Sequence, residues 1–315
     1  MALLYGLDGK KEERLVSVSI SRPNLKAAIY SDIVGRFYAG AVSGAIGFNG
    51  RALPVGLALA GSMKDDRPFF TEPLAKVGAD GKPAYPSDIK EDLDTAEVAA
   101  VTRNALTAQW DDNTTIVVSG PASNLAKVLA TGGAKAWIQR KVKTLVFTGG
   151  RFTEGPADDN IKADIEGAKR LFAEWPGTIV ACGAEMDGVL AYPASSIEKD
   201  YAWSPAHPVA DAYRAGGKMP WDAPLWAMNS ALYAVRPKEG YFKVSEPGTI
   251  SVLDDGRTRF TRRHRYLIFD PAQKDRILKA YTEIASAKPV EKPQRVPRPN
   301  QVVVKPAEVK QPEKP

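Results

Sequence analysis

The segment that decides the fold is Lys143 to Asp164, KTLVFTGGRFTEGPADDNIKAD. Thr144 to Thr148 is apolar and β-branched and stops at Gly149-Gly150, which is typical of an inner strand of a parallel sheet. A polar loop follows, and Ile161 to Trp175 then carries apolar residues at helical spacing. A strand, a polar loop and a helix in this order place ligand-binding groups at the carboxyl edge of an open α/β sheet. A plain strand–helix connection with solvated acids is the alternative.

The same alternation of strands and helices extends in both directions from this segment. Further strands are predicted at Leu15 to Ile20, Leu53 to Leu59, Thr115 to Ser119 and Thr178 to Gly183. Helices are predicted at Leu25 to Gly40, Asp94 to Trp110, Ala122 to Ala130, Pro224 to Val235 and Pro271 to Ala287. This order predicts an α/β fold with an open, doubly wound, mostly parallel sheet flanked by helices. Residues 61–93 and 195–220 are expected to be irregular, and a hairpin is expected around Asp255-Gly256.

Length and composition limit the class of protein. The chain has 315 residues, of which 44% are hydrophobic and 25% charged, which suits one α/β domain at residues 1–287. Residues 288–315 are rich in proline and lysine and predict a disordered, extended tail. That tail holds seven Lys or Arg and three Glu, so it accounts for +4 of the net charge of +6. The nearly neutral remainder argues against a nucleic-acid partner, and no stretch has the length and apolarity of a membrane span.

Four segments resemble, in the same order, segments of the inosine-uridine-preferring nucleoside hydrolases. They are TIVVSGPASNLAKVL from Thr115, TGG followed by DNIKAD, TIVACGAEMDGVLAYP from Thr178, and SALYAVRP from Ser230. The resemblance extends from about residue 15 to residue 270. It implies a protein that hydrolyses the N-glycosidic bond of purine or pyrimidine ribonucleosides to ribose and free base. It also implies calcium as cofactor, a nucleoside or ribose as small-molecule partner, no membrane, and compatibility with a homo-oligomer.

The resemblance also implies a missing part. In that family, a D-x-D-x-x-x-D-D motif at the end of the first strand supplies the general base and most calcium ligands. Met1-Ala2-Leu3-Leu4 resembles the helix just beyond that motif, so the first strand and the catalytic aspartates are absent from this sequence. No catalytic residue is therefore assigned. The other paired acids are predicted to be solvated loop pairs: Asp65-Asp66, Asp111-Asp112 and Asp158-Asp159.

Four residues are candidates for contacting the substrate. The resemblance places Asn24, Asp158 and Asn160 at positions that hold ribose hydroxyls, with Asp158 one methylene shorter than the family's glutamate. Glu185 follows a predicted strand, at a sheet edge where active-site acids lie. Asn24 is equally compatible with a turn-forming role.

Two residues are candidates for metal contacts. Ser119 matches a residue whose main-chain carbonyl binds calcium, although a strand-end serine without that role is a strong alternative. Asp222, in the pair Trp221-Asp222, matches the last calcium aspartate under one alignment. A second alignment places Trp226-Ala227 there instead, which would make Asp222 a helix N-cap.

These assignments leave three interpretations. The first is a calcium-dependent ribonucleoside hydrolase whose start was assigned too far downstream; the second is a catalytically inactive ribose-binding or scaffold protein of the same fold. The third is an unrelated α/β domain, which predicts that Ser119 and the loop from Arg151 to Asn160 do not meet at one pocket. The sequence as written predicts a cytoplasmic protein, and an exported one if a signal precedes it.

Overall fold

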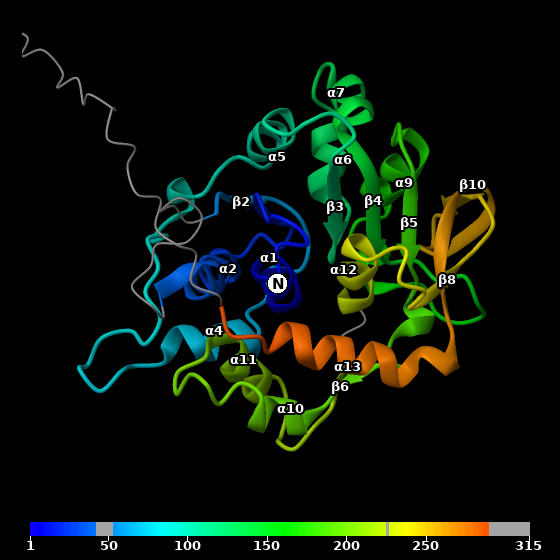
Figure 1. The fold of residues 1–315 in the computed structure, drawn as a ribbon. Coiled ribbons are helices and arrows are strands. Elements are labelled where there is room, and N and C mark those ends of the chain that lie inside the picture. Colours follow the sequence, from blue (N-terminus) through cyan, green and yellow to red (C-terminus); the bar gives the residue numbers. More distant parts are fainter. Residues whose placement is uncertain (42–52, 225–226, 290–315) are drawn as a thin grey trace, which may run out of the picture.

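The central sheet is mostly parallel, as the sequence predicts. The computed structural model describes residues 1–41, 53–224 and 227–289. The sheet has the order β3 (Thr114–Val118), β4 (Val142–Thr148), β5 (Ile179–Cys182), β10 (Thr258–Phe269), β8 (Phe242–Val244), with β9 (Gly248–Val252) also paired to β10. The strands β3, β4, β5 and β10 run parallel, whereas β8 and β9 are antiparallel to β10. The β9–β10 pair confirms the predicted hairpin around Asp255-Gly256 (Figure 1).

Two small sheets lie apart from the central one. One is the parallel pair β1 (Val18–Ile20) and β2 (Val55–Leu57), and the other is the antiparallel pair β6 (Ala191–Tyr192) and β7 (Ala223–Pro224). Within the described residues, β1 pairs only with β2, and β3 pairs only with β4. Each of these two strands therefore has one edge without a partner strand.

The helices cover both faces of the central sheet (Figure 1). Side chains alternate along the strands, so that Leu145 and Phe147 point to one face while Val180 and Cys182 point to the other. The helices α6 (Ser123–Leu129), α7 (Ala134–Lys141) and α9 (Ile165–Glu174) pack on the first face. The helices α1 (Ala2–Gly9), α12 (Ala227–Val235) and α13 (Lys274–Ala285) pack on the second. Cys182 is fully buried there.

The remaining elements surround this core. They are α2 (Leu25–Arg36) with a π-helical turn at Phe37–Ala41, α4 (Pro68–Ala75), α5 (Val98–Thr107), α8 (Asp159–Ala163), α10 (Ala194–Lys199), α11 (Pro208–Gly216), and the 3₁₀ turns Asp92–Asp94, Ala184–Met186 and Pro271–Gln273. Among the described residues, no helix is both long and apolar enough to cross a bilayer.

Three predictions of secondary structure are corrected. Residues 61–93 contain α4, which begins with Pro68 and buries Phe70, so a proline there starts a helix instead of excluding one. Residues 195–220 contain the C-terminal part of α10 and all of α11, and α11 likewise begins at a proline behind the N-cap His207. The helix predicted from Ile161 is divided in two, because Asp164 leaves the helical conformation and its carboxylate caps α9 by accepting from Gly167 N at 2.8 Å.

Candidate functional site

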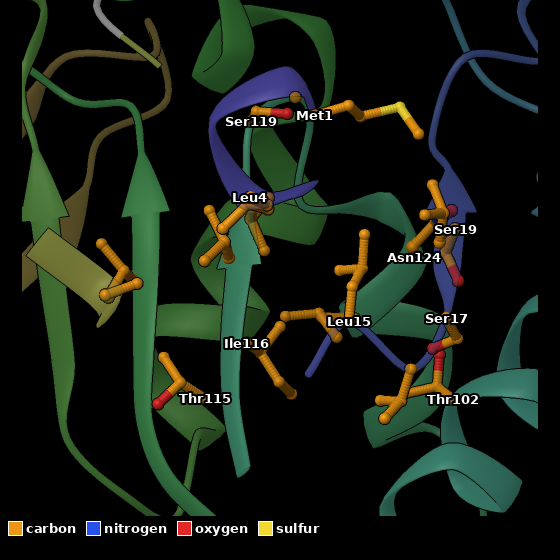
Figure 2. A pocket seen from close by; sticks show the side chains of 18 of the residues that line it. Met1, Leu4, Leu15, Ser17, Ser19, Thr102, Thr115, Ile116, Ser119 and Asn124 are labelled. Atoms are coloured by element: carbon orange, nitrogen blue, oxygen red, sulfur yellow. The ribbon is translucent and has the colours of Figure 1, made fainter. Parts of the chain in front are cut away.

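A large cavity lies between β1 and β3. It has a volume of about 1100 Å³ and is lined by both strands, by α1 and by residues of α5 and α6. Figure 2 shows Leu15 and Ile116 projecting into the space between the two strands, with Thr102 of α5 and Asn124 of α6 also facing it. The cavity therefore runs along the strands and reaches the carboxyl edge of the sheet, where ligands bind in open α/β folds.

The carboxyl edge of this cavity is lined mainly by hydroxyl and amide side chains, together with Arg22. Ser21 follows β1, Ser119 follows β3, Asn124 lies in the first turn of α6, and Asn160 lies in α8. None of the described residues that line this edge is an aspartate or glutamate; the lining acids are Glu12 and Glu13, before β1. Hydroxyl and amide groups both donate and accept hydrogen bonds, but they do not ionise near neutral pH. This edge is suited to binding polar hydroxyl groups.

Asn160 is held in place by the central sheet. Its Nδ2 donates to the carbonyl oxygen of Thr148, the last residue of β4, at 2.9 Å, and the side chain is buried. One amide hydrogen and the side-chain oxygen are left for a ligand. A buried amide fixed at a strand end is a well-positioned recognition group, because little rotamer entropy is lost when a ligand binds.

Asp158 has a different environment from the one predicted for a solvated acid pair. It is 4% exposed, and its carboxylate caps α8 by accepting from Ile161 N at 3.0 Å. Burial raises the pKa of this carboxyl group, and hydrogen bonds from the backbone of Ile161 and Gly150 oppose that rise. Asp158 does not line the cavity. Its carboxylate instead joins the Gly149-Gly150 turn to the start of α8.

Asn24 and Glu185 also lie outside the cavity lining. Asn24 caps α2 through Ala27 N, and its Nδ2 donates to Lys64 O and Asp66 Oδ1, both at 2.9 Å. Glu185 accepts from Phe152 N at 3.1 Å, burial raises its pKa, and its other oxygen is buried without a hydrogen-bond partner. The structure thus uses both side chains to fix loops, and their contact with a substrate stays a prediction.

The two residues predicted for calcium are not brought together at the cavity. Ser119 is exposed on its rim, whereas Asp222 does not line it and accepts from Ala194 N at 2.9 Å. Asp222 precedes β7 and binds the start of α10, so it does not cap the late helix, which begins at Ala227. Trp226, the alternative partner, lies outside the described residues.

Calcium requires several oxygen ligands, usually including carboxylates. In the part of the chain that the structure describes, no group of three or more His, Cys, Asp or Glu side chains could hold a metal ion. At the carboxyl edge of the cavity, the described side chains offer only hydroxyl and amide oxygens. The described residues therefore do not fit a calcium site.

The structure adds two lining residues that the sequence reasoning missed. Ser21 follows the short strand β1, and Asn124 is the last residue of the GPASN sequence and lies in the first turn of α6. For Ser21 the available signal was a polar residue directly after a predicted strand, and for Asn124 a polar residue in the first turn of the helix predicted after the next strand. Ser119 and Asn160 do line one cavity, although the rest of the loop from Arg151 to Asp159 does not.

Comparison with known proteins identifies the fold. No protein-family model matches the chain, and no curated protein matches it in sequence. Among solved structures, it resembles a plant nucleoside hydrolase, the PpNRh1 enzyme, with a TM-score of 0.63 and 17% identity over 91% of this chain and 94% of the other. It also resembles the inosine-uridine preferring nucleoside hydrolase from Bacillus anthracis, with a TM-score of 0.60 and 18% identity over 90% and 94%.

A further similar structure is the type III effector protein XopQ complexed with adenosine diphosphate ribose, with a TM-score of 0.58 and 15% identity over 92% of this chain and 89% of the other. These likenesses span nearly the whole of each chain and include the central sheet and its helices. The fold of this chain is that of the nucleoside hydrolases.

Proposed function

We propose that this protein binds a ribonucleoside through its ribose at the carboxyl edge of the cavity between β1 and β3. The observation that carries the proposal is the position of Asn160, which is buried, fixed to Thr148 and lines the same cavity as Ser21 and Ser119. Vicinal hydroxyls of a sugar both donate and accept hydrogen bonds, and amide and hydroxyl side chains match that pattern. Two solved proteins with this fold support the ligand class, one being a nucleoside hydrolase and the other a complex with adenosine diphosphate ribose.

Hydrolysis of the N-glycosidic bond is the second candidate function, favoured by the fold shared with nucleoside hydrolases. That reaction passes through an oxocarbenium-like transition state and needs an activated water molecule. Activation requires a general base within hydrogen-bond reach of the water. The described side chains at the carboxyl edge supply hydroxyls and amides, which are too weakly basic for that role. Binding without turnover is therefore the function that this geometry supports best.

Calorimetric titration with inosine, uridine and ribose tests the proposal. We expect saturable binding by the chain, weakened about tenfold in Asn160→Ala because one to two hydrogen bonds are lost. Asn104→Ala is the matched control, since Asn104 is exposed on α5 and does not line the cavity. Ser119→Ala is a second test that leaves folding intact, because Ser119 is exposed.

The same samples would be assayed for ribose release, once with calcium and once with a chelator. Binding without release supports the proposal. Release that requires calcium would replace it with the hydrolase interpretation. A folded chain that binds none of the three compounds would refute both.

A further inference from the structure

A positively charged residue stands at the carboxyl edge of the cavity. Arg22 is the second residue after β1, lines the cavity and is half-buried. Its neighbour Ser21 lies against the segment that follows β3, because a Cβ added to Gly120 would come within 2.6 Å of Ser21 Oγ. The segments that follow β1 and β3 therefore meet at this edge, and Arg22 is one residue away from the point where they meet.

The guanidinium group of Arg22 is only partly used within the protein. Nη1 donates to the carbonyl oxygen of Met63 at 2.9 Å and to that of Asp65 at 3.3 Å. Among the described residues, no carboxylate forms an ion pair with Arg22, and its Nε and Nη2 have no hydrogen-bond partner. These two nitrogens form one edge of the planar group, so their N–H groups are available side by side to a ligand. The two bonds of Nη1 hold the side chain in position.

The surroundings of Arg22 lack an anion that would compensate its charge. Burial lowers the pKa of Arg22, the charge of Arg67 lowers it further, and the carboxylate of Asp65 opposes this change. The next acid of the same loop, Asp66, is paired with Lys26. No aspartate or glutamate among the described residues lines the carboxyl edge. A half-buried cation with a second cation nearby is stabilised when an anion binds to it.

The free edge of the guanidinium selects the kind of anion. Two parallel N–H groups match two oxygens of one phosphate or carboxylate group, and such bidentate, charge-assisted hydrogen bonds are stronger than neutral ones. The ligand proposed for this cavity contains ribose, and the anionic group that ribose carries in nucleotides is a phosphate ester. The hydroxyl group of Ser21 is a donor that suits a further phosphate oxygen. The chemistry of this edge thus favours a phosphate.

We propose that the cavity binds a ribose that carries a phosphate group, with Nε and Nη2 of Arg22 donating to two oxygens of that phosphate. The proposal rests on the proposed function, because Asn160 and the hydroxyl side chains hold the ribose through its vicinal hydroxyls. The phosphate is therefore on the remaining position, the 5′ oxygen. The ligand class is a nucleoside 5′-phosphate or a related ribose 5-phosphate compound, and Arg22 determines the specificity for it over an unphosphorylated nucleoside.

Calorimetric titration of the full chain with four compounds tests the proposal. They are inosine, inosine 5′-monophosphate, ribose 5-phosphate and inorganic phosphate. We expect inosine 5′-monophosphate to bind about 10- to 100-fold more tightly than inosine, because hydrogen bonds to a charged group are added. Ribose 5-phosphate should also bind more tightly than ribose. Inorganic phosphate should bind at least about tenfold more weakly than inosine 5′-monophosphate, because it lacks the contacts of the ribose.

Variants of Arg22 separate its binding role from a structural one. Arg22→Gln should remove the preference for the phosphorylated compound and leave the affinity for inosine nearly unchanged. Arg22→Lys keeps the charge but loses the planar pair of donors, so it should retain only part of the preference. Arg103→Gln is the matched control, because Arg103 is exposed on α5 and does not line the cavity. If Arg22 only held the loop at residues 63–65, its replacement would change both affinities by the same factor.

The possible results distinguish this proposal from the proposed function. A wild-type chain that binds inosine as tightly as inosine 5′-monophosphate, or more tightly, overturns the phosphate proposal and leaves nucleoside binding in place. A chain that binds neither compound refutes both. A preference for the phosphorylated compound that persists in Arg22→Gln overturns the assignment to Arg22. Inorganic phosphate that binds as tightly as inosine 5′-monophosphate would assign Arg22 to a free anion and overturn the proposal as well.

Discussion

Replacement of Asp158 by alanine is expected to destabilise the fold strongly. The carboxylate caps α8 through Ile161 N at 3.0 Å and hydrogen-bonds to the backbone of Gly150, and the residue is 4% exposed. Loss of a helix cap costs about 1 kcal/mol. A buried backbone N–H left without an acceptor costs roughly 1–3 kcal/mol more. Asp158→Ala should therefore lower the free energy of unfolding by about 2–4 kcal/mol.

The neighbouring residue provides a matched control. Asp159 has a side chain that is 83% exposed and forms an ion pair with Lys162. Its replacement by alanine should change the free energy of unfolding by no more than about 0.5 kcal/mol, because exposed ion pairs contribute little. Asp158→Asn keeps an acceptor oxygen for the cap and should lose less than about 1 kcal/mol.

Urea unfolding followed by circular dichroism would measure all three variants. The slope of the free energy against urea must stay unchanged, so that the shift in midpoint reports stability alone. If Asp158→Ala loses no more stability than Asp159→Ala, the assignment of Asp158 as a structural cap is wrong. The prediction that Asp158 binds ribose would then be favoured.

Three further predictions follow from the environments of single residues. In Gly167→Ala, the new Cβ would lie 2.1 Å from Asp164 Oδ2, so this variant should displace the carboxylate that caps α9. Its free energy of unfolding in urea should fall by about 1–2 kcal/mol. Gly9→Ala is the control and should keep its stability, because the new Cβ meets nothing within 4 Å. Burial, with the carboxylate of Asp8 as a smaller cause, raises the pKa of Glu13 to about 7. The pKa of Glu13 is higher in the folded state than in the unfolded state, so stability should fall as pH rises from about 4.5 to 7, by at most roughly 3 kcal/mol. Thermal melts of Glu13→Gln should not show this decrease of stability with pH. Burial lowers the pKa of His207 to about 4. Stability should therefore be lost as pH falls from about 6.5 to 4, by at most roughly 3 kcal/mol. Identical pH profiles of melting temperature for the wild type and His207→Gln would contradict this prediction.

Much of the fold could be predicted from the sequence, because the decisive signals are local. The run from Thr144 to Thr148 forms the inner strand β4, and the Asp255-Gly256 turn joins β9 to β10. Each depends on residues close together in the chain, namely an apolar run ended by glycine and a turn dipeptide between alternating strands. The helices α4 and α11 escaped prediction because proline, taken as a sign of a loop, stands at their first positions.

The site was less predictable, because the same polar side chain serves as a helix cap or as a ligand group depending on its surroundings. Asn24 and Asp158 cap α2 and α8, and Asp222 binds the start of α10, whereas Asn160 faces the cavity. A cap is decided by which backbone N–H lies within hydrogen-bond distance of an oxygen, and the residue type does not reveal this.

The sequence by itself determined the order of strands and helices, the mostly parallel sheet and the stretch at which polar groups meet its carboxyl edge. Only the tertiary structure decided that β1 and β3 border one cavity, and that Ser119 and Asn160 share it. The physical reason is that periodicity and turn chemistry act over a few residues. The cavity, by contrast, depends on strands nearly 100 residues apart in the chain, whose unpaired edges become apparent only when the sheets are assembled.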